Sequence, residues 1–391
     1  MAVPRYLGIL SSYGADSRGE LEDQRKPHAA GGVGGVMRID DVIGSVRCCI
    51  RAMEGYVPGK QLSGGTYIKL NTNENPYPPS PRVLEALRQA VGAELRLYSD
   101  PMALRLRETA AELYGCEVDE VIAGNGSDDI LTIIFRTFLN AGDVLVTPAP
   151  SYTLYKPLSA LQDATFKEIP MGPDYTLPED LDTHGAKVVI IVNPNAPTGV
   201  LHPRTTLRAF LERTQSVVVI DEAYADFAGE HVIDMLKEFP NLIVVRTFSK
   251  AYALAGMRLG LGFARREVIA EMMKVKDSYN LDSLAIVAGC AALQDQAWLQ
   301  EIVGMIVRTR TWVQQELEGM GLYVPPSRSN FVFPAIPDGR AAEVFEALEK
   351  RRILVRYFRG PLTKDSIRIS IGTDAEMEVC LQALREFLTQ G

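Results

Sequence analysis

The sequence predicts an α/β fold with a large domain, in which helices cover a mostly parallel central sheet, and a smaller α+β domain. Continuous runs of valine and isoleucine recur through the middle of the chain, and such runs are typical of parallel strands buried on both faces. Segments with apolar residues at helical spacing alternate with these runs. The length of 391 residues is sufficient for two domains.

The elements of the large domain are predicted from about residue 81 onward. Helices are expected at 81–91, after a proline suited to a first turn, and at 106–115, which ends at a glycine. Residues 120–139 indicate a short strand, a glycine turn and an apolar helix. The buried strands are predicted at 143–150, 187–194, 216–223 and 242–249.

The C-terminal part of the chain has a different pattern. Long helical segments are predicted within 284–320. Short strands are predicted at 330–336, 353–358 and 366–372, and helices at 341–351 and 376–388. Together these segments predict a smaller α+β domain that follows the large one.

Four segments are therefore expected. They are a disordered tail at 1–36, an N-terminal arm with part of the smaller domain at 37–70, the large cofactor-binding domain at 71–282 and the smaller C-terminal domain at 283–391. The tail is polar and rich in glycine, and Met37 is a candidate functional start. A transit peptide is the alternative interpretation of the tail, but Glu20, Glu22 and Asp23 argue against it.

Charge and composition argue against several classes of function. The net charge of −8 gives no support for nucleic-acid binding through a basic surface. No apolar run approaches the roughly 20 residues that span a bilayer, so no membrane partner is expected. Five scattered cysteines favour a reducing cytoplasm over a disulfide framework, and the four histidines lack metal-ligand spacing. A cytoplasmic protein without a metal site is predicted.

Polar motifs follow the predicted strands at the points where the strands end. They are GNGSDD (124–129), NPNAPTG (193–199), DEAY (221–224) and FSK (248–250). Ligands of open α/β sheets bind beyond these carboxyl ends. Lys250 stands among small residues, and Arg258 follows eight residues later. An amine that forms a Schiff base needs a polar pocket with anion-binding groups nearby, so the pattern indicates a pyridoxal 5'-phosphate enzyme anchored at Lys250.

These motifs, in this order, resemble the fold-type I aminotransferases, and within them the histidinol-phosphate aminotransferase subfamily. The further motifs that carry the resemblance are GYVPGK (55–60), KLNTNENPYPPSP (69–81), YSDP (98–101), PSYTLY (150–155) and IRISIGT (367–373). The resemblance covers about residues 45–391. It implies an aspartate-aminotransferase-like fold, pyridoxal 5'-phosphate as cofactor, and transamination between an amino donor and a 2-oxo acid acceptor.

The resemblance implies a catalytic role for three residues. Lys250 would form the Schiff base and, once released, move the substrate proton. Asp221 would pair with the pyridine nitrogen and keep it protonated, so that the ring accepts electrons. Tyr224 would donate a hydrogen bond to the ring O3′.

The phosphate of the cofactor would be held at a helix N-terminus. Gly126, Ser127 and Asp128 would present backbone N–H groups, with Asp128 acting through its amide only. Ser249 would add a hydroxyl and Arg258 a fixed cation. Taken alone, a GNGS turn is often an ordinary loop.

Two tyrosines complete the predicted cofactor site. Tyr152 resembles the aromatic residue that stacks on the pyridine ring. Tyr98 resembles a tyrosine that reaches the cofactor phosphate of a neighbouring subunit. The second match implies a homodimer with shared active sites.

Four residues would form the substrate side. Arg368 matches an arginine that grips a substrate α-carboxylate, or the glutamate co-substrate when the donor has none. Arg356 and Tyr56 match contacts to a substrate phosphate, and Asn330 occupies a position that often lines the pocket. Arginine binds a carboxylate as well as a phosphate, so these residues are compatible with a phosphorylated or a carboxylated donor.

One motif departs from the subfamily pattern. The subfamily often has NPNNPTG, whereas this chain has NPNAPTG with Ala196 where an asparagine would bind O3′. Tyr224 would then hold O3′ alone, or Asn195 would reach it after a small backbone shift. One lost neutral hydrogen bond costs about 1 kcal/mol, which leaves the chemistry possible.

The sequence leaves three functions to be weighed. The first is transamination of histidinol phosphate with 2-oxoglutarate in histidine biosynthesis. An aromatic amino-acid aminotransferase or a phosphothreonine-type decarboxylase would use the same scaffold. A non-enzymatic ligand-binding regulator with this fold is the third, but Lys250, Asp221 and Arg258 are all retained.

Overall fold

The computed structural model describes residues 38–56, 59–60, 66–172, 174–179, 181, 183 and 185–389. The chain divides into two compact units, Met1–Arg47 and Cys48–Gly391. The described residues of the first unit contain one short helix, α1 (Ile39–Gly44). The predicted tail at 1–36 and the candidate start Met37 lie outside the described residues.

The second unit is built on a seven-stranded sheet. In spatial order its strands are β2 (Val121–Asn125), β8 (Leu259–Phe263), β7 (Leu242–Thr247), β6 (Val217–Asp221), β5 (Ala186–Val192), β3 (Val144–Ala149) and β4 (Thr165–Pro170). Only β8 runs antiparallel to its neighbours, and all other pairs are parallel. The predicted α/β fold class is confirmed.

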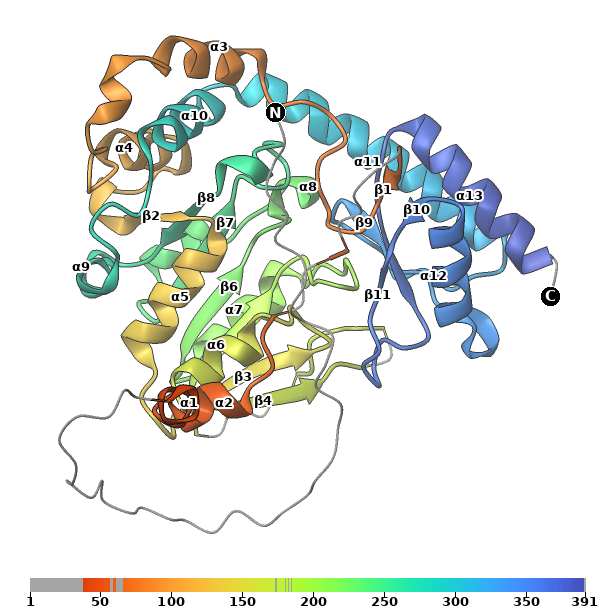
Figure 1. The fold of residues 1–391 in the computed structure, drawn as a ribbon, viewed down its shortest axis with the longest axis horizontal. Coiled ribbons are helices and arrows are strands. Elements are labelled where there is room, and N and C mark those ends of the chain that lie inside the picture. The colour runs from red at the N-terminus through yellow and green to blue at the C-terminus, as the bar shows by residue number, and fades with distance from the viewer. Residues whose placement is uncertain are drawn as a thin grey trace. The chain divides into compact units, whose positions relative to one another are not determined.

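Helices flank this sheet (Figure 1). They are α2 (Cys48–Ala52), α3 (Pro81–Ala90), α4 (Leu104–Tyr114), α5 (Ser127–Phe138), α6 (Tyr155–Leu161), α7 (Arg204–Arg213), α8 (Ala225–Ala228), α9 (Arg266–Val275) and α10 (Ser283–Leu293). Helix α5 packs along β2, β7 and β8, and its apolar side chains are buried there. This contact places the N-terminus of α5 at the edge of the sheet where β2 ends.

The C-terminal part forms smaller sheets covered by helices. β1 (Ile68–Lys69) pairs in parallel with β10 (Ile353–Leu354), and β12 (Ile367–Ser370) lies between β11 (Arg356–Tyr357) and β9 (Phe331–Val332). The helices are α11 (Gln296–Gly319), α12 (Ala341–Lys350) and α13 (Asp374–Thr389). The short β1 precedes all strands of the large sheet in the sequence but pairs with β10. The smaller sheets are therefore built from two separate segments of the chain. The division into domains at residues 70 and 282 stays a prediction.

Two strands of the large sheet were not predicted, and each has a physical reason. β4 is an edge strand with mostly exposed, polar side chains, so it lacks a buried apolar run. β8 has the sequence LGLGF, in which glycines hide the strand pattern. A Cβ at Gly260 would lie 2.5 Å from the carbonyl carbon of Gly126 and from the nitrogen of Ser127. Glycine at this position lets β8 approach the turn before α5 closely.

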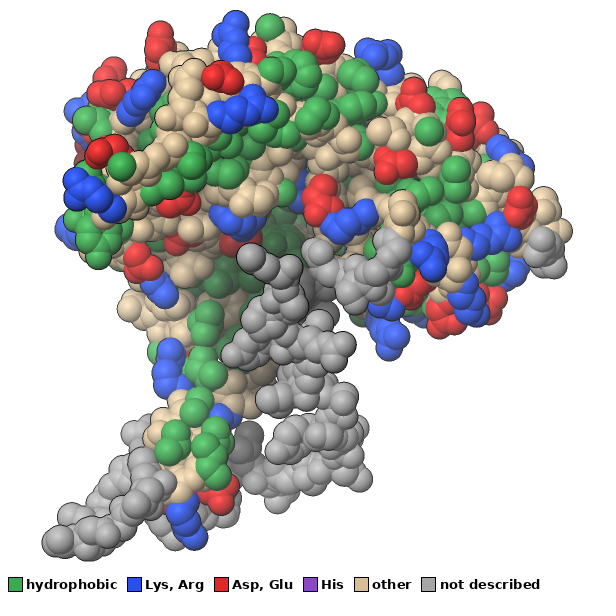
Figure 2. Space-filling model, turned by 45° about the horizontal axis from the view of Figure 1, so that its top comes forward, with side chains coloured by type: hydrophobic (Ala, Val, Ile, Leu, Met, Phe, Trp, Pro, Cys, Tyr) green, Lys and Arg blue, Asp and Glu red, His purple; other side chains and the backbone are tan. Residues whose placement is uncertain are grey.

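Acidic and basic side chains are interspersed over the face drawn in Figure 2. The apolar side chains of the central strands are buried instead, including those of Val218, Val219 and Ile220. In the described part of the chain, no helix is long and apolar enough to cross a lipid bilayer.

Candidate active site

Most of the residues predicted to bind the cofactor lie at one edge of the large sheet. β6 ends at Asp221, β7 leads into Ser249 and Lys250, and β2 leads into Gly126. These three strands share one direction, because β2 and β7 are both antiparallel to β8, which lies between them. Their carboxyl ends therefore meet at the same edge, as the sequence predicts.

Lys250 is held in a polar enclosure. Its Nζ donates a hydrogen bond to the carbonyl oxygen of Thr72 at 3.0 Å. The side-chain amide of Asn75 donates to the carbonyl oxygens of Lys250 and Ala251 at 3.2 and 3.0 Å, which fixes the backbone that carries the amine. Burial, followed by the charge of Arg368, lowers the pKa of Lys250 to about 8. About a tenth of the amine is thus unprotonated at neutral pH, as nucleophilic attack requires.

Asp221 is a buried carboxylate with two hydrogen-bond donors and no cation bonded to it in the described residues. The hydroxyl of Tyr155 donates to Oδ2 at 2.7 Å, and the backbone N–H of Ala223 donates to Oδ1 at 3.1 Å. Its exposed fraction is 4%. Burial raises the pKa of Asp221 to about 6. A cation beside this carboxylate would stabilise its ionised form and offset the cost of burial. A protonated ring nitrogen is such a cation.

The hydroxyl of Tyr224 is positioned by Asn73, a residue that the sequence reasoning did not single out. The amide of Asn73 donates to Tyr224 Oη at 2.9 Å. The Ser370 hydroxyl donates to Oδ1 of Asn73, and the Asn73 N–H donates to the same hydroxyl, both at 2.9 Å. Asn73 has a positive φ of 55°, a backbone conformation that asparagine tolerates better than most residues. Tyr224 is thereby tied to the smaller sheets through β12.

An anion cradle forms where β2 turns into α5. Gly126 has a φ of +85°, and a Cβ there would lie 2.6 Å from Nη2 of Arg258, so glycine suits both the turn and the close cation. The first N–H groups of α5, beginning with Ser127, have no partner within the helix. Ser249 is buried, and its hydroxyl accepts from Thr247 Oγ1 at 3.1 Å; Thr247 pairs with Gly260, which lies against this turn. Backbone amides, a hydroxyl and a guanidinium thus converge, as phosphate binding requires.

Asp128 contributes more than the predicted backbone amide. Its carboxylate accepts from Nη2 of Arg258 at 3.2 Å and from the hydroxyl of Tyr152 at 3.3 Å. Asp128 therefore orients a cation and an aromatic ring that both belong to the predicted cofactor site. The sequence alone could not show this, because Tyr152 is 24 residues away.

The aromatic side of the site is formed by tyrosines. Tyr152 meets the ring of Tyr56 edge-on at 6.0 Å and the ring of Tyr155 edge-on at 5.6 Å between centroids. Burial raises the pKa of Tyr152, so its hydroxyl stays protonated and able to donate. Tyr56 is 42% exposed and forms the outer wall.

Two arginines lie side by side on adjacent strands. Arg356 on β11 is the register partner of Arg368 on β12. Arg368 donates to the carbonyl oxygen of Asn71 at 3.0 Å, and its guanidinium lies 5.3 Å from the ring centroid of Phe331. Burial, opposed by the Tyr224 hydroxyl and then reinforced by Arg356, lowers the pKa of Arg368. Close like charges of this kind favour an anion between or beside them.

Two buried polar atoms near these arginines have no partner within the described residues. They are Nε of Arg368 and Oδ1 of Asn330. The amide nitrogen of Asn330 donates to the carbonyl oxygen of Asn73 at 3.0 Å, so its oxygen is directed elsewhere. Buried polar groups are normally paired, and unpaired ones at a site point to a missing ligand.

A groove of 1300 Å³ opens beside Arg356. Its walls include Tyr56, Ser151, Pro197, Arg356 and Phe358. The groove is large enough for a small-molecule substrate.

Two predicted residues are not brought to the site of their own chain. Tyr98 is 83% exposed and stacks on Tyr279 with 4.4 Å between ring centroids. Asn195 is buried in its own loop, where its amide donates to the Pro150 carbonyl at 3.2 Å and accepts from the Thr198 hydroxyl at 2.9 Å. The nitrogen and the oxygen of the Asn195 amide therefore both have partners within the protein. Neither is directed to the cofactor O3′ in this arrangement.

Three residues that sequence reasoning left unassigned hold the predicted ones. Thr72, Asn75 and Tyr155 lie within the motifs quoted above but were given no role. Among the described residues, no group of three or more histidine, cysteine, aspartate or glutamate side chains is placed to hold a metal ion.

The fold and this geometry define a class of enzyme, one that binds a phosphorylated aldehyde cofactor through a half-buried amine. Residues 65–384 match the model of the family described as aminotransferase class I and II, and the chain belongs to this family. Its cofactor is pyridoxal 5'-phosphate.

The individual relatives carry a more specific name. Histidinol-phosphate aminotransferase of Syntrophotalea carbinolica is 45% identical over 338 residues, which are 86% of this chain and 97% of the relative. Histidinol-phosphate aminotransferase 1 of Trichormus variabilis is 41% identical over 88% of this chain and 98% of its own. The crystal structure of the Sinorhizobium meliloti histidinol-phosphate aminotransferase with pyridoxal 5'-phosphate has a TM-score of 0.80 at 28% identity, over 88% of this chain and 98% of that one.

Proposed function

We propose that this protein transfers the amino group between histidinol phosphate and 2-oxoglutarate, as a step of histidine biosynthesis. The observation that carries the chemistry is Lys250, a half-buried amine with a pKa near 8 beside the buried Asp221. The relatives named histidinol-phosphate aminotransferase support the choice of donor. The two adjacent arginines supply cations for two anionic substrates in turn.

The residues present fit the cofactor. Asp221 lacks a cationic partner in the described residues. At the turn before α5, Gly126 lies beside the guanidinium of Arg258, so backbone N–H groups and a cation are available for one phosphate. When bound, pyridoxal 5'-phosphate supplies an aldehyde for covalent attachment and a ring that withdraws electrons. Asp221 would hold the ring nitrogen, Tyr224 the ring hydroxyl, and Ser127, Ser249 and Arg258 the phosphate.

The protein's own groups would then perform the proton movements. Lys250 Nζ would take the proton from the substrate Cα, because an amine with a pKa near 8 is a competent base close to neutral pH. Tyr152, oriented through Asp128, would cover one ring face and keep water from it. Asn75 would hold the Lys250 backbone during the transfer.

Substrate choice would depend on the two arginines. Arg368 is more enclosed and lies close to Tyr224 and Lys250, so it would bind the α-carboxylate of glutamate. Arg356 lines the open groove with Tyr56, so it would bind the phosphate at the far end of the donor. The aromatic walls would accept a flat ring between these ends.

Replacement of Arg356 with alanine should separate the two substrates. We expect Arg356→Ala to raise KM for histidinol phosphate by about 10- to 100-fold, because a charge-assisted contact is lost, and KM for glutamate by less than about threefold. Steady-state kinetics with each substrate varied in turn measures both values. Arg351→Ala, which removes an exposed arginine paired with Glu386, serves as the matched control. Equal effects on both substrates would contradict the role of Arg356.

An aromatic amino-acid aminotransferase is the second candidate, because tyrosines line the substrate side. The donors histidinol phosphate, phenylalanine and tyrosine should be compared by kcat/KM in the unmodified enzyme. A preference for phenylalanine or tyrosine would contradict the proposed donor. The alternative would then account for the aromatic walls.

We also propose a cytoplasmic homodimer. Support for the dimer comes from exposed apolar side chains around Tyr98, namely those of Leu95, Leu97, Met102, Leu104 and Tyr279. The cytoplasmic location is supported by cysteines that are all free thiols. Sedimentation equilibrium of the holoenzyme should give twice the 43.0 kDa of one chain. A monomeric, active holoenzyme would contradict the assignment of Tyr98 to a neighbouring site.

A further inference from the structure

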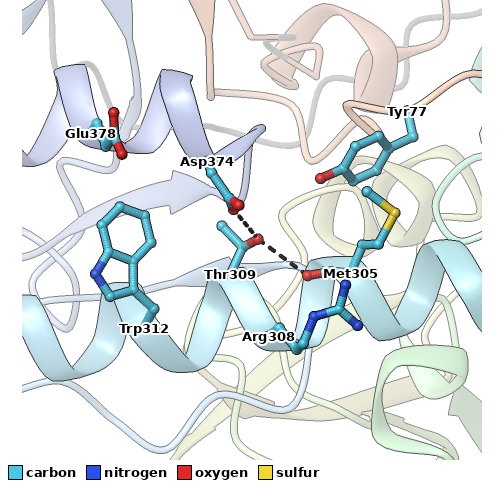
Figure 3. Close-up of a pocket in the computed structure, with 7 residues that line it drawn as sticks. All are labelled: Tyr77, Met305, Arg308, Thr309, Trp312, Asp374 and Glu378. Carbon is cyan, nitrogen blue, oxygen red and sulfur yellow. Dashed lines mark hydrogen bonds between the residues drawn. The ribbon is translucent and has the colours of Figure 1, made fainter.

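A second hollow lies between helices α11 and α13, outside the site described above. Its volume is 310 Å³, at the lower end of the roughly 300–1,000 Å³ typical of small-molecule sites. Its walls are formed by Tyr77, Met305, Arg308, Thr309, Trp312, Asp374 and Glu378 (Figure 3). None of these residues belongs to the predicted cofactor or substrate set.

Four of the residues that line the hollow come from helix α11. Met305, Arg308, Thr309 and Trp312 stand at positions i, i+3, i+4 and i+7, so they share a helix face. Arg310 projects from a different face, where its guanidinium donates to the carbonyl oxygen of Ser329 at 2.8 Å. The face of α11 that lines the hollow is therefore distinct from the face that carries Arg310.

Charged groups of both signs line the hollow without pairing with one another. Within the described residues, no hydrogen bond or ion pair joins the side chains of Arg308 and Glu378 to a partner. Asp374 Oδ1 accepts the hydroxyl of Thr309 at 2.6 Å, which fixes that carboxylate and leaves its other oxygen available. Figure 3 shows Asp374 between the indole of Trp312 on one side and Arg308 with Tyr77 on the other.

These groups match the parts of one kind of molecule. A guanidinium binds a carboxylate through two parallel hydrogen bonds, and a carboxylate beside an indole binds an ammonium. Trp312 and Tyr77 add flat apolar surfaces that favour a planar ring. Two carboxylates in the same wall disfavour a purely anionic ligand such as phosphate. We propose that this hollow binds a zwitterionic α-amino acid with a flat side chain, its carboxylate on Arg308 and its ammonium on Asp374 and Glu378.

The chain offers a direct probe of this site. It has only two tryptophans, Trp298 and Trp312, so Trp298→Phe leaves one indole in the wall of the hollow. The experiment uses holoenzyme whose cofactor has been reduced onto the protein with borohydride, so that the active site cannot react with an amino acid. L-Phenylalanine and L-histidine are titrated while the Trp312 emission is recorded.

We expect a saturable change in Trp312 emission with at least one of the two amino acids below about 10 mM. Arg308→Gln should weaken binding by about tenfold or more, because a charge-assisted contact is lost. Arg385→Gln, which removes an exposed arginine on α13 paired with Glu316 on α11, should leave binding unchanged. Phenethylamine and 3-phenylpropionate, which each lack one charge of phenylalanine, should bind at least tenfold more weakly.

Calorimetric titration of reduced holoenzyme without the Trp298 substitution repeats the measurement if that variant folds poorly. The absence of saturable binding would overturn the proposal. Binding that is unchanged by Arg308→Gln would place the ligand elsewhere and would also overturn it. Equal binding of phenethylamine and phenylalanine would remove the role of Arg308. Each outcome is independent of the transamination activity, because the reduced cofactor cannot react with an amino acid.

Discussion

Lys250→Ala is expected to reduce transamination by at least about 10⁴-fold with any amino donor, because the variant loses both the covalent anchor and the proton-transferring base. Among the described residues, Nζ of Lys250 makes one hydrogen bond, to the Thr72 carbonyl, so its loss removes little from the fold. The thermal midpoint of the cofactor-free variant should lie within a few degrees of the parent. Single-turnover and steady-state assays measure the first effect, and circular dichroism measures the second.

Chemical labelling gives the same prediction an independent check. Borohydride reduction of the native holoenzyme should attach the cofactor to the peptide that contains Lys250, as peptide mass spectrometry would show. Lys274→Ala is the control, because Lys274 is exposed and pairs with Glu271 on the same helix. Near-native turnover in Lys250→Ala, or a label on another lysine, would contradict the proposed chemistry.

Asp221→Asn is expected to reduce kcat by about 10²- to 10⁴-fold and, at neutral pH, to stabilise the cofactor-free protein. The loss of activity follows because a neutral amide cannot keep a ring nitrogen protonated. The gain in stability follows from burial, which raises the pKa of the Asp221 carboxyl from 3.8 to about 6. Ionising that buried carboxyl at neutral pH costs about 3 kcal/mol of folding free energy.

The sign of the pH dependence follows from the two states. Below about pH 4 the carboxyl is protonated in both the folded and the unfolded chain, so it contributes no pH dependence. Between about pH 4 and pH 6 the unfolded chain releases the proton while the folded chain retains it, so the free energy of unfolding falls as pH rises. Above about pH 6 the full penalty is present and no longer changes.

Asparagine removes this penalty but loses one acceptor, since Tyr155 and the Ala223 N–H both donate to the carboxylate. That loss costs about 1 kcal/mol. The cofactor-free variant should therefore be slightly less stable than the parent at pH 4 and about 2 kcal/mol more stable at pH 7. Urea unfolding at a series of pH values measures the difference. A constant difference across pH would contradict a perturbed Asp221.

The central strands could be predicted because burial on both faces leaves a local trace. Val218, Val219 and Ile220 form an unbroken apolar run, and β6 lies within the predicted range. The exposed edge strand β4 leaves no such trace, and β8 is hidden by glycines that are needed for contact with another element. The sequence therefore predicts strands that are buried on both faces. It does not predict an exposed edge strand, or a strand whose composition is set by contact with one neighbouring element.

The candidate site shows the same division. Lys250, Asp221 and Arg258 stand in motifs that follow strands, so their chemistry and position could be proposed together. The groups that hold them come from far along the chain, as with Asn73 against Tyr224, 151 residues apart, and Thr72 against Lys250, 178 residues apart. No local pattern encodes such a contact. Sequence motifs predicted Arg368 and Arg356 as site residues. Their position opposite each other on adjacent strands is known only from the register of the sheet.

One short segment, residues 68–75, contacts several parts of the protein that are distant from one another in the sequence. It supplies a strand to β10, an amide to Tyr224, a carbonyl to the reactive lysine and an amide to the lysine's own backbone. Shortening the protein from its N-terminus past Tyr67 would therefore strip the catalytic amine of its scaffold while leaving every motif on the large sheet in place. A trimmed protein that keeps the substrate groove as well has to begin before Tyr56, which lines that groove.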